Sequence, residues 1–252
     1  MFFIKKDEEL DDPRREFLVN ALTAGAFIST GAMGLMVPAQ AEAGIFGKVP
    51  RKVPPGKSIF DMKGEVRVNG DLASEDTLIK GEDTVETGDN SQAIFVVGKD
   101  AFILHSNSKL TLSGTGLLLN NLRLFTGRLL SVFGKRSRKE GALAAITSTA
   151  TIGIRGTGVY FESEPDLSYV CTCYGVTNLV SNADPTSKEL IASEHHDAPR
   201  YVTSDGAAGK RVRPAPFKNH TDLELMLIEE LVGRVPPFTV ADTDYSAPRR
   251  GY

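Results

Sequence analysis

The chain has 252 residues, of which 41% are hydrophobic and 24% are charged, as is usual for soluble globular domains. Removing residues 1–43 takes four basic and seven acidic residues from totals of 29 and 32, which leaves 25 of each. This near-neutral balance lacks the excess of Lys and Arg with which nucleic-acid-binding proteins contact phosphates, so we expect no nucleic-acid partner. With only two cysteines, the chain is also not a disulfide-stapled miniprotein.

The amino-terminal region has the layout of an export signal. Arg14 and Arg15 are followed one residue later by Phe17 and a leucine, an arrangement that resembles the twin-arginine signal. No charged residue occurs between Phe17 and Ala41, and small residues up to Ala43 suit cleavage by signal peptidase. We therefore predict that residues 1–43 are a twin-arginine-type signal peptide and that the mature protein is periplasmic. Undiminished export after both arginines become lysine would contradict this.

An inner-membrane anchor formed by residues 17–38 is the alternative. The uncharged stretch is longer than the roughly 20 apolar residues that span a bilayer. Three glycines within it and Pro38 before the cleavage sites favour cleavage instead. The first interpretation predicts that the chain contacts the membrane only transiently, through its signal segment.

The pattern after a Pro- and Lys-rich linker at residues 44–57 predicts an all-β domain over residues 58–200. Short runs of β-branched and aromatic residues are separated by glycine about every ten residues, which is typical of a sandwich or barrel. The predicted strands are Glu65–Val68, Thr84–Glu86, Gln92–Val97, Ala101–His105, Lys109–Leu112, Leu122–Phe125, Arg128–Phe133, Leu143–Thr147, Ala150–Arg155, Val159–Glu162, Tyr169–Tyr174 and Lys188–His195.

An extension at residues 201–235 contains the one clear helical period. Thr221 and Glu224 have the spacing of a capping box, which predicts a helix over residues 221–232 that ends at Gly233. We expect one of its faces to carry the apolar residues Leu223, Met226, Leu227 and Leu231. The Pro- and Arg-rich tail at residues 236–252 is predicted to be disordered.

Three segments together resemble the FecR family. They are residues 81–88 (GEDTVETG), with Ser91 and Ala93 just after, residues 127–133 (GRLLSVF) and residues 147–157 (TSTATIGIRGT). The resemblance covers about residues 60–180 and implies a periplasmic β domain like that of iron-citrate transport regulators, which receive a signal from an outer-membrane receptor. It also implies a jelly-roll-like antiparallel β-sandwich, here with one short C-terminal helix.

The chain departs from that family at its start. The iron-citrate regulators place a cytoplasmic sigma-factor-binding domain before their membrane helix, whereas sixteen residues precede the uncharged stretch here. So short a segment rarely folds unaided. We therefore expect no signalling to a cytoplasmic sigma factor by this chain alone, and a β domain that binds a ligand, an envelope protein or a cell-wall polymer.

Motifs of common enzymes are missing from the sequence. It contains no Gly-x-Ser-x-Gly elbow, no phosphate-binding Gly-x-x-x-x-Gly-Lys loop and no His-Glu-x-x-His pair. We therefore expect a non-catalytic protein. The basic cluster at Lys135, Arg136, Arg138 and Lys139 is consistent with an anionic polymer as ligand, or with a solvated hairpin tip. We expect Arg155 to satisfy backbone carbonyls at a corner of the sheet rather than to bind an anion.

The strongest candidate for chemistry is a metal site at Cys171, Cys173 and His196. Thiolates and imidazoles suit zinc, copper or iron. The sequence nevertheless favours two ordinary strand cysteines beside a polar turn, and no cofactor, over this metal site. A turn at Asp184-Pro185 predicts a hairpin with Cys173 opposite His196 and Cys171 opposite Ala198. Residues two apart share a face, so both sulfurs and the His196 imidazole should converge while His195 points away.

A disulfide between the two cysteines is disfavoured, because Cα atoms two apart on a strand lie about 6.6–6.8 Å apart, at the edge of the bridging range. We expect the thiols to stay free or to bind metal. Asp197, His220 and water are the alternatives for a fourth ligand. A metal-dependent sensor or carrier is accordingly the second functional hypothesis.

Overall fold

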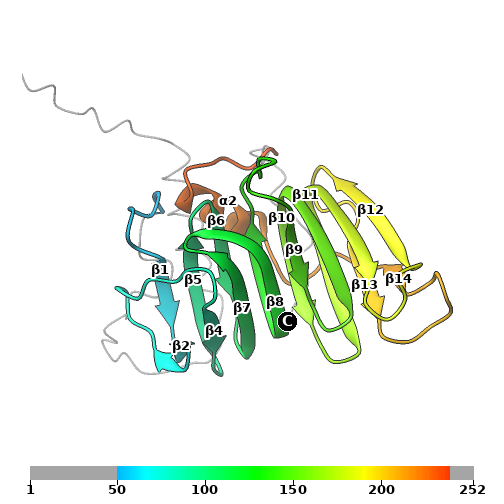
Figure 1. Cartoon of the computed structure of the whole chain (residues 1–252), viewed down its shortest axis with the longest axis horizontal. Coiled ribbons are helices and arrows are strands. Elements are labelled where there is room, and N and C mark those ends of the chain that lie inside the picture. Colours follow the sequence, from blue (N-terminus) through cyan, green and yellow to red (C-terminus); the bar gives the residue numbers. More distant parts are fainter. Residues whose placement is uncertain (1–49, 239–252) are drawn as a thin grey trace, which may run out of the picture. The chain divides into compact units, whose positions relative to one another are not determined.

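The computed structural model describes residues 50–238, which form fourteen strands and one helix (Figure 1). The predicted signal peptide, the alternative anchor, the first residues of the linker and most of the predicted tail lie outside these residues. The elements are β1 (Ile59–Lys63), β2 (Val66–Val68), β3 (Asp71–Leu72), β4 (Thr84–Thr87), β5 (Gln92–Val97), β6 (Asp100–Leu104), β7 (Ser108–Thr115), β8 (Leu118–Val132), β9 (Leu143–Ile146), β10 (Ala150–Ser163), β11 (Leu167–Ser181), β12 (Lys188–Ser193), β13 (Arg200–Thr203), β14 (Val212–Pro214) and α2 (Asp222–Leu231).

The strands form two layers that share three long strands. Residues 118–126 of β8 pair with β7, whereas residues 127–132 pair with β10 and, in part, with β6. In the same way, β11 pairs with β13 near its start and with β12 near its end. The first layer therefore runs β3-β2-β4-β7-β8-β9-β10-β11-β12. The second runs β1-β5-β6-β8-β10-β11-β13-β14.

Glycine occupies the point at which each long strand changes partners. Gly127 in β8, Gly156 in β10 and Gly175 in β11 have φ values of 92°, 60° and 88°, which other residues rarely adopt. At Gly127 a side chain would also collide, because a Cβ atom there would overlap the hydroxyl of Ser108. Such bends let one strand serve both layers, as β-bulges and glycine kinks do in other curved sheets.

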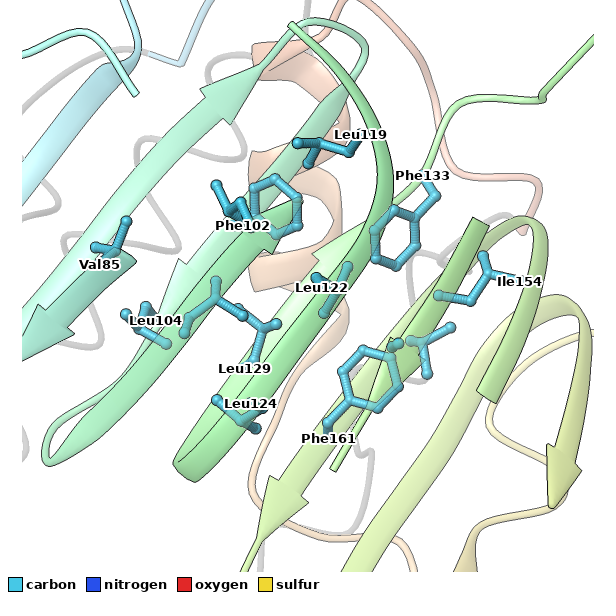
Figure 2. Close-up of a cluster of buried hydrophobic side chains, with 14 of the residues drawn as sticks. Val85, Phe102, Leu104, Leu119, Leu122, Leu124, Leu129, Phe133, Ile154 and Phe161 are labelled. Carbon is cyan, nitrogen blue, oxygen red and sulfur yellow. The ribbon is translucent and has the colours of Figure 1, made fainter. Parts of the chain in front are cut away.

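The main core lies between the two layers. Figure 2 shows Phe102 of β6, Leu129 of β8 and Phe161 of β10 among the side chains of this core. The Phe102 ring stacks on Phe95 with 5.0 Å between centroids and meets Phe133 edge-on at 5.8 Å. These rings and the buried aliphatic side chains around them exclude water from the space between the layers.

A second apolar surface lies on the opposite side of the second layer. Side chains alternate along a strand, so Ile103 and Leu130 point away from the core that Phe102 and Leu129 enter. Both are nevertheless buried, because α2 covers them by packing on β6 and β8 (Figure 1). We call this surface, formed by Ile94, Ala101, Ile103, Leu130 and Val132, the outer face.

The helix α2 begins as the sequence predicts. Thr221 is its N-cap, and the reciprocal hydrogen bonds of a capping box join Thr221 and Glu224. The predicted apolar face is partly wrong, because Leu223 and Met226 are only half-buried. The fully buried apolar side chains are Leu225, Leu227, Ile228 and Leu231.

The all-β class with a C-terminal helix is confirmed, and three details differ from the predictions. β8 and β9 are parallel, so the basic cluster between them is a crossover and not a hairpin tip. Arg155 is exposed, so its donors do not need carbonyl partners inside the fold. The sheet continues past residue 200 through β13 and β14. Within residues 50–238, no helix is long and apolar enough to cross a membrane.

Candidate metal centre

Four potential metal ligands meet beside the outer face. Cys171 and Cys173 lie two residues apart on β11 and therefore share a face, while His196 follows β12 and His220 directly precedes the N-cap of α2. The ligand atoms of all four residues lie within 4.8 Å of one another. Three segments that are distant in sequence thus bring two thiols and two imidazoles to one point.

The distances between these atoms suit a tetrahedral ion. The Sγ atom of Cys171 is 3.5 Å from Nδ1 of His196, and Sγ of Cys173 is 3.4 Å from Nε2 of His220. The two imidazole nitrogens are 3.1 Å apart. In a tetrahedral zinc site with bonds of about 2.0–2.3 Å, neighbouring donors lie roughly 3.3–3.8 Å apart. The four residues therefore need only small shifts to hold such an ion.

The second nitrogen of each imidazole is already held. Nε2 of His196 bonds the carboxylate of Asp222 at 3.0 Å, and Nδ1 of His220 bonds the backbone oxygen of Lys218 at 2.8 Å. In the neutral form of each ring, donation of this N–H group leaves a lone pair on the nitrogen that faces the thiols. Metal-binding histidines usually have such partners, which fix the tautomer and the ring orientation.

The pKa values of the cluster depart from their ordinary ranges. Burial opposes ionisation of Cys171, but hydrogen bonds from Cys173 and the two histidines outweigh it and hold the pKa of Cys171 well below the usual range. Burial and the neighbouring Cys171 raise the pKa of Cys173. Burial lowers the pKa of His196, but hydrogen bonds to Asp222 and Cys171 outweigh it and raise this pKa to about 9. The Cys171 thiol therefore loses its proton at a lower pH than the Cys173 thiol.

Aromatic rings enclose the cluster. Tyr160 stacks on the imidazole of His220 with 4.4 Å between centroids, and Phe217 lies 4.5 Å from the ring of His196 and 4.6 Å from that of His220. Both cysteines are fully buried, and His220 is 3% exposed. Four protein donors in so closed a place match a structural metal site, whereas catalytic zinc sites keep a position open for water or substrate.

The predicted hairpin is present, but its register differs by one residue. Ser181 and Ser187 close a five-residue turn centred on Asp184, and the β11–β12 ladder ends at Gly175 opposite Ser193. Cys173 is therefore not paired with His196 through the regular ladder. The reason is the odd length of the turn, which the carboxylate of Asp184 stabilises by accepting hydrogen bonds from Thr186 and Ser187.

His196 reaches the cysteines by another route. Its backbone has a φ of 55° and its N–H donates to the carbonyl of Cys173 at 2.9 Å. This turn directs the His196 imidazole to the thiols, while His195 is half-exposed and bonds Asp222. Cys171 and Cys173, the two predicted thiol ligands, are free cysteines in the structure. Metal binding at these residues itself stays a prediction.

Among the alternatives for a fourth ligand, the structure favours His220. The carboxylate of Asp197 accepts the backbone N–H groups of Glu194 and His195 instead, so it shapes the loop that carries His196. The sequence held one signal for His220, its place immediately before a capping box. That position anchors the imidazole to the start of a docked helix, but only a tertiary contact brings it to β11.

No family model and no curated protein matches the chain. The comparisons show no family. Two crystal structures from Parabacteroides distasonis, each of a protein provisionally described as an anti-sigma factor, are similar with a TM-score of 0.40 and 10% identity. The alignment covers 48% of this chain and 55% of that chain. The FecR resemblance therefore stays a prediction.

Proposed function

We propose that this chain is a non-catalytic zinc-binding β domain. The observation that carries the proposal is the meeting of Cys171, Cys173, His196 and His220 within 4.8 Å, with both imidazoles already oriented. Two sulfur and two nitrogen donors at tetrahedral spacing favour zinc over copper(II), which prefers square-planar sites. Zinc would supply charge neutralisation and a cross-link between chain segments, with no open position for a substrate.

The export route and the periplasmic location stay predictions of the sequence, as do a further ligand, a protein partner, an envelope component and a part in signal sensing. A closed zinc site is compatible with each of them. Because such a site has no open position for a substrate, its role would be structural or sensory rather than catalytic. The proposal therefore develops the second hypothesis, that of a metal-dependent sensor or carrier. It assigns four ligands to the metal in place of the three that the sequence predicts.

Metal analysis of the purified full-length chain tests the proposal. We expect one zinc ion per chain after purification under reducing conditions. Because the Cys173 thiol and the protonated His196 must lose protons to bind a metal, zinc affinity should rise as the pH increases towards 9. A folded chain that neither retains zinc nor binds it from solution would overturn the proposal.

Replacing Asp222 by asparagine should weaken zinc binding without abolishing it. Loss of the carboxylate removes the partner that orients His196, and changes of this kind typically cost about 10–100-fold in metal affinity. Competition with a chromophoric chelator measures the affinity. The exposed Asp76, changed in the same way, is the control and should leave the affinity unaltered. Equal affinities for the Asp222→Asn variant and the wild type would show that the carboxylate does not position this ligand.

A further inference from the structure

The chain after β14 crosses to the outer face of the second layer. We call residues 215–238 the C-terminal segment; it contains His220 and α2. Its helix buries Leu225 and Ile228 against β6 and β8, on the surface that Ile103 and Leu130 form. The segment is therefore the cover of an otherwise exposed apolar face.

The candidate ligands are divided between the sheet and this cover. Cys171, Cys173 and His196 belong to β11 and the loop after β12, whereas His220 belongs to the C-terminal segment. The residue after His220 is the N-cap of α2, so a bond to His220 fixes the beginning of the helix. Asp222, in the first turn, accepts hydrogen bonds from His195 and His196 and therefore depends on the same loop.

We infer that the metal is a latch: its occupancy decides whether the C-terminal segment stays docked on the outer face. The inference rests on the proposed function, because it assigns a regulatory role to that zinc site. Loss of the ion removes the metal bond between His220 and the sheet and leaves the weaker contact of His220 with the Cys173 thiol and the stacking of its ring on Tyr160. The segment then opens from the end that carries His220, and α2 leaves Ile103 and Leu130 open to water.

The segment also has contacts outside the cluster. The Tyr169 hydroxyl donates to the carbonyl of Pro216 at 3.0 Å, and Arg234 donates to the carbonyl of Lys99 at 2.7 Å. Glu162 accepts hydrogen bonds from Lys218 and Asn219, and Glu229 accepts one from Tyr174. These contacts fix the conformations of long side chains, and the entropy that the side chains lose offsets part of the free energy that the contacts contribute. A helix of ten residues is also too short to be stable by itself in water, so α2 depends on staying docked.

Hydrogen exchange of the full-length chain, with zinc bound and after chelation under reducing conditions, tests the latch. We expect the amides of α2 to exchange at least about tenfold faster without zinc, while those of β5 and β6 change little. A dye that binds apolar surfaces should fluoresce more strongly in the zinc-free chain. His220→Ala should reproduce both effects in the presence of zinc, and chelation of the wild type supplies the same comparison if this variant does not fold.

Glu162→Gln is the matched control, since it weakens the hold on Lys218 and Asn219 but leaves all four ligands in place. It should retain zinc and change the exchange of α2 by less than about threefold. If zinc binds but α2 exchanges equally fast in both states, the latch is wrong and the zinc site stands. If chelation loosens β5 and β6 as much as α2, zinc supports the whole domain and the latch is also wrong. If no zinc binds, the proposed function itself fails.

Discussion

Replacing Cys173 by serine is expected to weaken zinc binding so far that the purified chain no longer retains one tightly bound ion. A serine hydroxyl stays protonated at neutral pH and is a hard oxygen donor, so it does not replace a thiolate. Structural zinc binds zinc-finger peptides with about 10–16 kcal/mol at pH 7, and losing one thiolate should weaken binding by at least about a thousandfold, or roughly 4 kcal/mol. Metal analysis after gel filtration and a chelator titration measure the loss.

Thr172→Val provides the matched control for this change. Thr172 lies between the two cysteines on β11 and is equally buried, but it faces the other way and bonds the hydroxyl of Thr177. The valine variant keeps the volume of the side chain and should retain zinc. Retention of a full equivalent of tightly bound zinc by Cys173→Ser would contradict the assignment of Cys173 as a ligand.

Replacing Asp100 by alanine is expected to lower the free energy of unfolding by about 3–5 kcal/mol, because it leaves the charge of Arg136 buried without its partner. The side chains of this ion pair are 1% and 7% exposed, and Asp100 also accepts the backbone N–H of Gly134 at 3.1 Å. Urea unfolding should show a lower midpoint with an unchanged slope.

The exposed pair of Lys57 and Asp76 is the control for this experiment. Its side chains are 55% and 88% exposed, and Lys57→Gln should change stability by only about 0–1 kcal/mol. A loss equally small for Asp100→Ala would mean that Arg136 finds another partner or reaches water in the variant. In that case the ion pair does not fix the crossover between β8 and β9.

Local patterns predicted the secondary structure well, with an instructive error at the glycines. The strand at Gln92–Val97 and the start of α2 were predicted correctly because alternation and capping depend on neighbours in sequence. The predicted strands stop before Gly127 and before Gly156, whereas each of these glycines bends one continuous strand from one layer to the other. A glycine permits both outcomes, and only the pairing of distant strands selects between them.

The sequence by itself determined the all-β class and the capped helix, and it predicted Cys171, Cys173 and His196 as candidate ligands, because strand periodicity and ligand chemistry are local properties. Tertiary structure alone decided that His220 joins them, because this depends on where α2 docks, about fifty residues along the chain from the cysteines. Tertiary structure also determined that Arg136 points inward and pairs with Asp100. Arg136 belongs to a basic cluster whose sequence pattern is typical of a solvated surface. Charge pattern cannot predict that choice, since a buried ion pair needs a partner that folding supplies from another strand.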